Sequence, residues 1–337
     1  MDTIKWCVIG AGGIADRRGI PALLSDPRNE IVAVMDRSKD VARAVAEKYG
    51  ISAYYDDAEE MLKNIDCQLV YIATPVFCHF DQAMLALRYG KHTLIEKPLA
   101  MNSREAQTLL DAYMAAGKQL TIGYMMGYHN LHEKMRQIIA EGGIGQLQNA
   151  RFQFACWYPD IPGAWRQTKA LGGGGCIADL GVHCMELFSS ITGDDIADCK
   201  AYLSTRTFRY EVEDSAVIIF RSKTGVLGHI DVNFNLPDAA VQSKVEFYGT
   251  AGSIVALGTM GQTESGTMEY IHAPQGDYEA AQNRVDPVPE TYTGAGGNIY
   301  LKQFNDFADM VRREKPCYDN ALQALKIQKL CDEIYAQ

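Results

Sequence analysis

The residue types that could move a proton or stabilise a negative charge lie in two segments of the sequence. Lys97 stands in the stretch EKP directly after an apolar run, and Asp179 and His183 stand four residues apart in the stretch DLGVH. A lysine ammonium can stabilise a developing alkoxide, and an imidazole can accept a proton near neutral pH. These side chains therefore suit acid–base chemistry at an oxygen atom.

Strands and helices alternate through the first third of the chain, and this alternation must position Lys97. Apolar runs predict strands at residues 4–9, 31–35, 69–73, 93–95 and 119–123. Helical patterns lie between them, up to residue 24 and over residues 41–49, 81–89 and 104–116. The alternation predicts an α/β fold with a doubly wound parallel sheet.

Two loops of this sheet are expected to face a bound cofactor. Ligands of such sheets bind outside the carboxyl ends of the strands. Thr74 and Pro75 follow one predicted strand, and Glu96 and Lys97 follow the next along the chain. Pro98 favours extended backbone at Lys97 and prevents the strand from continuing as a helix.

A glycine-rich turn, GAGGIA, joins the first predicted strand to the first helix. In such a unit Gly10 permits the tight turn, Gly12 lets the backbone approach a pyrophosphate, and Ala15 keeps helix and strand close. Gly13 and Ile14 complete the turn, and the helix N-terminus attracts the phosphate charge. The pattern is weak by itself, because glycine turns also join strands to helices for structural reasons, but its position supports dinucleotide binding.

The second predicted strand ends at Asp36, which is followed by Arg37. A carboxylate at this separation from the glycines can accept hydrogen bonds from the adenosine ribose hydroxyls, which favours NAD over NADP. Arg37 leaves NADP open, because a guanidinium could stack on adenine or pair with a ribose 2′-phosphate. The structural alternative for both residues is a solvated loop.

After residue 123 the pattern changes to long alternating segments. Residues 148–158, 198–206, 211–221, 226–235 and 243–248 predict antiparallel strands with one covered face. Helices are predicted over residues 131–141, 177–191, 300–313 and 321–335, and a long loop over residues 274–297. We therefore expect a dinucleotide-binding domain at residues 1–123 and a substrate-binding α/β domain with a mostly antiparallel open sheet at residues 124–337.

The segment that carries Asp179 and His183 begins with four glycines, Gly172 to Gly175. These could cradle phosphate, bring a loop close to a ligand or simply permit flexing. If residues 177–191 are helical, Asp179 and His183 lie one turn apart on one face, where a carboxylate can orient an imidazole. The alternatives are a packing histidine and a surface contact.

Composition excludes several other classes of function. The 42 acidic residues outnumber the 32 Lys and Arg, so with a formal charge of −10 and no basic cluster neither nucleic acid nor an anionic membrane is an expected partner. No apolar run approaches the ~20 residues of a membrane span, and the first residues lack a secretory signal. The 9 cysteines include no C-x-x-C pair, which predicts reduced thiols in the cytoplasm and no metal site.

The stretches GAGGIA, ATPVFCH, GKHTLIEKPLA and WRQTKALGGGGCIADLGVH, with the C-terminal helices, resemble the glucose-fructose oxidoreductase and inositol dehydrogenase family, Gfo/Idh/MocA. The resemblance runs along nearly the whole chain. It implies a Rossmann domain joined to an α/β domain whose open sheet commonly forms an oligomer interface, so that a homodimer or homotetramer is expected. It also implies NAD(P)-dependent oxidation or reduction of a carbon of a sugar, glycoside or cyclitol.

The family pattern also implies roles for individual residues. Lys97 and His183 would be catalytic, and Asp179 would line the site with them. Cofactor contacts would fall on Thr74, Pro75, His79, Glu96, Lys97, Trp165 and Arg166, and substrate contacts on Lys97, Trp165, Arg166, Asp179 and His183. Independently of the family pattern, Tyr128 is expected to contact substrate, because an aromatic face suits a sugar ring. Two positions depart from the pattern: Gly127 stands where many members have arginine, and Glu186 where an aspartate commonly follows the histidine.

Two other functions are compatible with these residues. An enzyme that keeps its NAD could oxidise a glycoside transiently, eliminate the aglycone and return the hydride, with little net formation of NADH. A non-catalytic NAD-sensing protein could retain the fold, but it would be expected to lose Lys97, Asp179 or His183, and all three are present.

Overall fold

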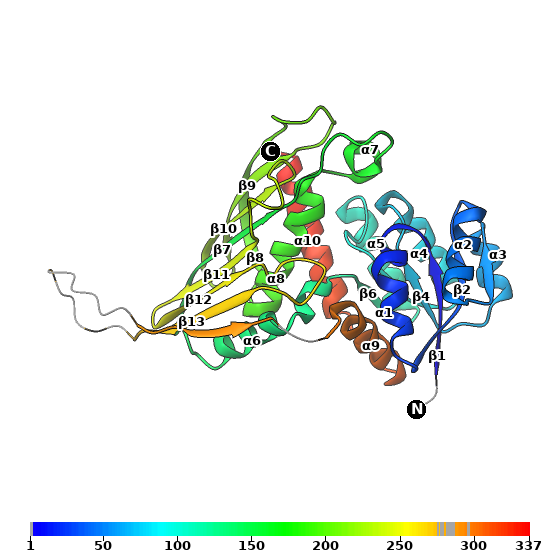
Figure 1. Cartoon of the computed structure of the whole chain (residues 1–337), viewed down its shortest axis with the longest axis horizontal. Coiled ribbons are helices and arrows are strands. Elements are labelled where there is room, and N and C mark those ends of the chain that lie inside the picture. Colours follow the sequence, from blue (N-terminus) through cyan, green and yellow to red (C-terminus); the bar gives the residue numbers. More distant parts are fainter. Residues whose placement is uncertain (1–2, 275, 277–279, 281–286, 295–296) are drawn as a thin grey trace. The chain divides into compact units, whose positions relative to one another are not determined.

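The computed structural model describes residues 3–274, 276, 280, 287–294 and 297–337 (Figure 1). These form two compact units. The first comprises Met1–Met125, Thr168–Gly173 and Tyr300–Asp332, and the second comprises Met126–Gln167, Gly174–Ile299 and Glu333–Gln337. The units are not two continuous halves, because a short middle segment and most of the two C-terminal helices belong to the first.

The first unit contains a six-stranded sheet in which every neighbouring pair is parallel. Its strands are β1 (Ile4–Ile9), β2 (Asn29–Met35), β3 (Ala53–Tyr55), β4 (Leu69–Ile72), β5 (His92–Ile95) and β6 (Leu120–Ile122). The order β3-β2-β1-β4-β5-β6 reverses between β1 and β4, as in doubly wound dinucleotide-binding sheets. The predicted Rossmann-type fold is confirmed, although β3, a short edge strand, was not predicted.

Helices connect the strands of this sheet. They are α1 (Ile20–Leu24), α2 (Lys39–Tyr49), α3 (Ala58–Asn64), α4 (His79–Arg88) and α5 (Ser103–Ala115). The short α7 (Lys169–Gly172) also belongs to this unit, but it lies in the separate middle segment Thr168–Gly173 and connects none of these strands. Local sequence sets their ends: the Asn102 side chain accepts the Glu105 N–H at the start of α5, and Gly50, in the left-handed region, ends α2. A π-helical turn, Ala15–Gly19, precedes α1.

Two C-terminal helices, α9 (Ile299–Arg312) and α10 (Asp319–Tyr335), follow the second sheet in the chain. The side chains of α9 contribute to the core of the first unit. The Trp6 ring of β1 lies 5.5 Å from the Phe304 ring and 5.6 Å from the Phe307 ring, and the Tyr71 ring of β4 lies 5.0 Å from Phe304. All four residues are almost completely buried, so this cluster joins α9 to the parallel sheet.

The second unit contains an eight-stranded sheet with the order β14-β13-β12-β11-β7-β10-β9-β8. Its strands are β7 (Leu147–Ala155), β8 (Ile196–Ser204), β9 (Ser215–Ser222), β10 (Leu227–Asn233), β11 (Lys244–Gly249), β12 (Gly252–Leu257), β13 (Thr267–His272) and β14 (Glu290–Thr293). All neighbouring pairs are antiparallel except β7 and β10, which are parallel. The prediction of antiparallel strands is wrong for this pair, because β10 returns to β7 by a long crossover rather than a hairpin.

One face of this sheet is covered, as the alternation predicted. Helices α6 (Asn130–Ala140) and α8 (Val182–Thr192) lie on it (Figure 1). Along β9 the buried residues Ala216, Ile218 and Phe220 alternate with exposed Val217 and Ile219. The residues that point away from the helices form an open face.

The loop predicted over residues 274–297 is wrong at Glu290–Thr293, which form β14 and pair with β13. Residues 275, 277–279, 281–286 and 295–296 of that loop lie outside the described residues. Within the described part of the chain, no helix combines the length and apolar character required to cross a membrane.

Candidate active site

The glycine-rich turn after β1 approaches the loop after β4 closely. Gly10 has a φ of 88°, and a Cβ on it would lie 2.7 Å from Thr74 Cγ2 and 2.9 Å from the carbonyl carbon of Ala73. Only glycine fits this position without displacing the loop. The Gly10 N–H also donates to the Met35 carbonyl oxygen at 2.8 Å, which ties the turn to the end of β2.

The carboxylate after β2 borders the same turn. Asp36 accepts the Gly12 N–H at 3.3 Å and the Ser38 N–H at 3.0 Å, whereas Arg37 is exposed. These two hydrogen bonds fix the carboxylate beside the turn, where the fingerprint requires an acceptor for ribose hydroxyls.

The outer side of the turn fits a dinucleotide. Gly13 has a φ of 56°, and no atom lies within 4 Å of a Cβ placed on it. Ile14 is half-buried and directly precedes the π-helical turn. The backbone at the start of a helix therefore remains accessible beside a carboxylate, which is the arrangement that a pyrophosphate and a ribose need.

His79 connects the loops that follow β4 and β5. Its Nδ1 lies 2.9 Å from the Pro98 carbonyl oxygen, and its Nε2 lies 2.9 Å from the Thr74 carbonyl oxygen. The residue is 1% exposed. The imidazole thus supports both loops, one of which contains Pro75, while its contact with the cofactor stays a prediction.

Glu96 and Lys97 emerge together at the end of β5. The Tyr71 hydroxyl donates to Glu96 Oε1 at 2.6 Å, and burial raises the pKa of Tyr71 well above its usual value, so that the hydroxyl remains a donor. Lys97 is half-buried, and its peptide bond to Pro98 is cis. The strand therefore presents the lysine next to a carboxylate of fixed position.

In the second unit, the Arg166 guanidinium is held between an aromatic ring and a carboxylate. Its carbon lies 4.3 Å from the centroid of the Trp165 ring, and its Nε lies 3.5 Å from Asp179 Oδ1. Burial raises the pKa of the nearby Tyr158 hydroxyl, and the positive charge of Arg166 opposes that shift. The structure thus brings together three of the predicted site residues, Trp165, Arg166 and Asp179.

His183 lies in α8, is 2% exposed, and has its ring centroid 6.4 Å from that of Phe154. The α-helix predicted over residues 177–191 is only partly correct, because Ile177–Gly181 form a π-helical turn and α8 begins at Val182. A π-helical turn is wider than an α-helical one, so Asp179 and His183 do not have simple one-turn spacing. We call residues 177–192 the acid–base segment.

The glycines before this segment are required by packing. A Cβ on Gly174 would lie 1.9 Å from the Tyr335 hydroxyl oxygen, and one on Gly175 would lie 2.1 Å from the Glu213 carbonyl oxygen. Gly173 has a φ of 76° and ends α7. Protein atoms therefore occupy the space beside Gly174 and Gly175 that a cradled phosphate would need.

The two positions that depart from the family pattern are neighbours. A Cβ on Gly127 would lie 3.3 Å from Glu186 Oε1. Glu186 is 7% exposed, and burial raises its pKa to about 8, although a hydrogen bond from Ser190 and the charge of Arg136 oppose the shift. Tyr128, which follows Gly127, is half-buried. The Glu186 carboxyl group thus faces the Cα atom of Gly127, with no side chain between them.

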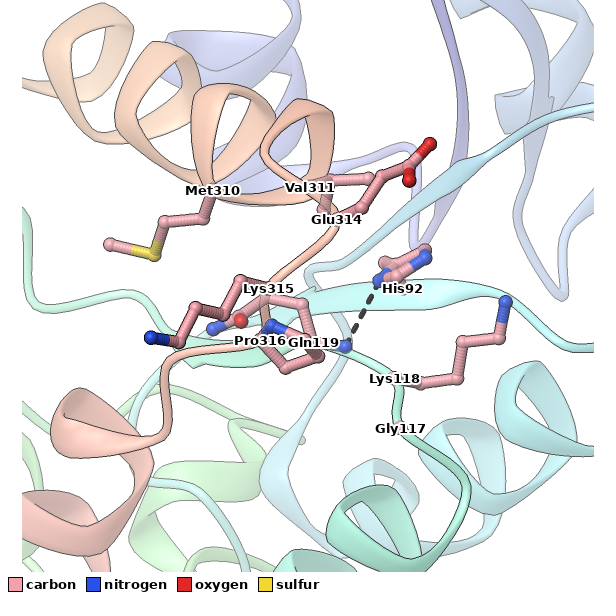
Figure 2. Close-up of a pocket in the computed structure, with 9 residues that line it drawn as sticks. All are labelled: His92, Gly117, Lys118, Gln119, Met310, Val311, Glu314, Lys315 and Pro316. Carbon is pink, nitrogen blue, oxygen red and sulfur yellow. Dashed lines mark hydrogen bonds between the residues drawn. The ribbon is translucent and has the colours of Figure 1, made fainter.

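A pocket of about 200 Å³ in the first unit is separate from these residues (Figure 2). It lies where β5 and β6 begin, at the edge of the sheet opposite the carboxyl ends. His92 accepts the Gln119 N–H through Nδ1 at 3.0 Å, and burial, with a contribution from Lys118, lowers the pKa of His92 to about 4. Lys315 and Glu314 complete its charged lining, and no residue of the glycine-rich turn lines the pocket.

Sequence reasoning missed Glu213 and Tyr335, which meet behind the acid–base segment. The available signal was the pair Glu213 and Asp214 at the start of a strand, since adjacent acids at a buried position need several donors. Among all the described residues, no group of three or more His, Cys, Asp and Glu side chains is arranged to hold a metal ion.

The fold and these sites define an oxidoreductase with an NAD-binding Rossmann domain. Residues 4–124 match the model of the oxidoreductase family with an NAD-binding Rossmann fold, and residues 132–255 match the GFO/IDH/MocA C-terminal domain. The chain belongs to the Gfo/Idh/MocA family, which confirms the resemblance seen in the sequence.

Individual relatives agree with this membership. The chain is 32% identical to the 1,5-anhydro-D-fructose reductase of Ensifer adhaerens over 270 residues, 80% of each chain. It is 31% identical to the D-glucoside 3-dehydrogenase of Escherichia coli K12 over 196 residues, 56% of this chain and 54% of the relative. A levoglucosan dehydrogenase solved with NADH and levoglucosan has the same fold, with a TM-score of 0.88 at 19% identity over 99% of this chain and 97% of the other.

Proposed function

We propose that the chain transfers a hydride between the nicotinamide of NAD and a secondary hydroxyl or ketone carbon of a sugar, glycoside or cyclitol. The observation that carries the proposal is the Asp179 carboxylate held by Arg166 in the segment that also carries His183. The relatives named for anhydrofructose reduction and glucoside dehydrogenation support the substrate class.

The glycine-rich turn would hold the cofactor. Gly10, Gly12, Gly13 and Ile14 would contact the pyrophosphate, and Asp36 would accept hydrogen bonds from the ribose hydroxyls. A carboxylate at this position repels a 2′-phosphate, which is why we prefer NAD to NADP. The remaining proposed cofactor contacts are Arg37, Thr74, Pro75, His79, Glu96, Lys97, Trp165 and Arg166.

When bound, the nicotinamide supplies the acceptor or donor of the hydride. His183 would take the proton of the reacting hydroxyl as general base, and the low exposure of its ring keeps bulk water away from that proton. Lys97 would donate a hydrogen bond to the same oxygen and stabilise its negative charge in the transition state. Asp179 would accept a hydrogen bond from a neighbouring hydroxyl, and Trp165 and Tyr128 would pack on the ring.

As functional domains, residues 1–123 would bind the dinucleotide, and residues 124–337 would bind substrate and form a homodimer or homotetramer. The open face of β8–β10 supports assembly, because Tyr202, Ile219 and Leu227 are 89%, 58% and 58% exposed there. Light scattering of wild type and Ile219→Asp tests this: a monomeric wild type would contradict it.

All nine cysteines are free thiols, which supports a cytoplasmic location.

The decisive test is reduction of NAD⁺, and separately of NADP⁺, with a panel of inositols, free sugars and glycosides. Lys97→Met should lower kcat about 10²-fold or more, because its hydrogen bond strengthens in the transition state. Lys118→Met, at the pocket in Figure 2, is the matched control and should retain wild-type activity.

Other outcomes would change the assignment. If Lys97→Met raises only KM, the lysine binds substrate without acting on the reacting oxygen. If wild type forms no reduced cofactor but copurifies with NAD(H) and releases aglycone from a glycoside, the enzyme uses the hydride step transiently. If it binds NAD(H) and does neither, the function is non-catalytic.

A further inference from the structure

One residue, Glu213, binds three consecutive backbone amides at the start of the acid–base segment. Its carboxylate accepts the Gly175 N–H at 3.0 Å through each oxygen and the Ile177 N–H at 3.0 Å through Oε1. Its carbonyl oxygen accepts the Cys176 N–H at 3.1 Å. The backbone that leads into the segment, residues 175–177, is therefore held by the side chain and the carbonyl group of one residue.

Glu213 is itself held in place. It is 7% exposed, and the Tyr335 hydroxyl donates to its Oε1 at 2.8 Å. The missing side chain of Gly174 leaves the room that this hydroxyl occupies. A buried carboxylate is stable only where donors replace its hydration, and two amides and a phenol do so here.

We propose that Glu213 is a positioning residue for the reaction and that Tyr335 fixes its carboxylate. The inference rests on the proposed function and deepens it, because neither residue needs to touch substrate or cofactor. The connection to the acid is short: the Asp179 N–H donates to the Gly175 carbonyl oxygen at 3.1 Å. A shift of Gly175 therefore moves Asp179 and the helix that follows it.

Asp214 provides a matched control one residue away. It is 0% exposed, and its carboxylate accepts the N–H groups of Thr207 and Phe208 at 2.8 and 3.1 Å and an amide hydrogen of Asn235 at 3.1 Å. The Arg206 N–H and the Ser215 hydroxyl donate to the same carboxylate at 3.3 and 3.0 Å. Asp214→Asn thus changes a carboxylate that is at least as buried as that of Glu213 and has more donors, but it holds a loop outside the acid–base segment.

Steady-state kinetics of Glu213→Gln, Tyr335→Phe and Asp214→Asn test the proposal on the substrate that wild type oxidises. Glu213→Gln should lower kcat about 10- to 100-fold with little change in KM, since a displacement of about 1 Å costs up to about 10²-fold. The primary isotope effect of a substrate deuterated at the reacting carbon should rise, because the hydride step becomes rate-limiting. Tyr335→Phe should also lower kcat and raise the isotope effect, but by less than Glu213→Gln.

Asp214→Asn should melt at a lower temperature yet keep the wild-type kcat and isotope effect within about twofold. An unchanged kcat and isotope effect in folded Glu213→Gln would overturn the proposal. If Glu213→Gln does not fold, Tyr335→Phe decides, because it removes one hydrogen bond and leaves the amide contacts. Equal losses in all three variants would show a purely structural role and would also overturn it.

Amide hydrogen exchange separates this proposal from the proposed function. In Glu213→Gln the amides of residues 175–177 should exchange at least about tenfold faster than in wild type, while those of residues 206–208 should not. Asp214→Asn should show the reverse. If wild type turns over no sugar, the proposed function fails. If the amides of residues 175–177 exchange equally slowly in Glu213→Gln and in wild type, Glu213 does not hold this backbone, and the positioning role fails independently of the proposed function.

Discussion

The Nε atom of Arg166 lies 3.5 Å from Oδ1 of Asp179, and the same guanidinium covers the Trp165 ring at 4.3 Å. The side chains of Arg166 and Asp179 are 37% and 24% exposed, so solvent screens the pair and its direct contribution to stability is small. Its importance is geometric, because a guanidinium stacked on an indole can orient a carboxylate.

Arg166→Lys should therefore lower kcat/KM about tenfold while changing the free energy of unfolding by less than about 1 kcal/mol. A lysine keeps the charge but cannot stack as a planar group or hold the carboxylate in one orientation. Initial rates and urea denaturation measure the two quantities. Arg43→Lys, which changes an exposed pair with Asp40, serves as control, and equal effects in both variants would contradict a role in orientation.

His183→Ala should lose about 10²- to 10⁴-fold in kcat, as expected for removal of a general base. Cofactor affinity, measured by fluorescence titration with NADH, should change by less than about threefold. The variant must retain a cooperative melting transition, because the ring is buried. A loss of less than about tenfold in kcat of a folded variant would show that His183 is not the general base.

Gly10→Ala should reduce both stability and affinity for NAD. The left-handed backbone costs about 1 kcal/mol for alanine, and contact with Thr74 and Ala73 adds about 1–3 kcal/mol for overpacking. Gly90→Ala is the matched control, because Gly90 has a φ of 69° and no atom within 4 Å of its added Cβ. It should incur only the backbone cost and bind NAD normally. Calorimetry measures the stability and the NAD affinity of both variants, so the cost of the left-handed backbone can be separated from the cost of the contact with the Thr74 loop.

Glu186→Gln should stabilise the protein increasingly as the pH rises. The carboxyl has a pKa of about 8 when folded and an ordinary value near 4.5 when unfolded, so the folded state binds the extra proton between these values. Wild type therefore loses up to about 1.4 kcal/mol per pH unit from this group across that window. Denaturation of both proteins at pH 5 and pH 8.5 measures the difference, and a difference that does not depend on pH would contradict the raised pKa.

Much of the first unit follows from local sequence. Apolar runs separated by helical patterns predict the parallel sheet, and turn chemistry places Gly10 and Asp36 at the ends of its strands. Lys97 could be placed because Pro98 marks where a strand ends. Edge strand β3 was not predicted, because a strand of only three half-exposed residues is too short to show an alternating pattern of apolar and polar residues.

The second unit shows where local signals end. Alternation predicts β7 to β11 of its sheet but not β12, β13 and β14. It also carries no information on whether β10 lies parallel to β7, since that depends on the path between them. Likewise, residues 177–181 have a helical pattern, yet the start of the segment is wound as a π-helical turn. The hydrogen bonds of distant residues decide such details.

Local patterns in the sequence were enough to predict the Rossmann sheet, the glycine turn and the resemblance to an oxidoreductase family, and to select Lys97, Asp179 and His183 as candidate reactive residues. Periodicity, turn residues and motif spacing are local properties, so they can be read along the chain. The hydrogen bonds between Glu213 and Gly175, 38 residues apart, could be found only in the folded structure, because contacts between distant segments form when the elements pack and leave no regular spacing in the sequence.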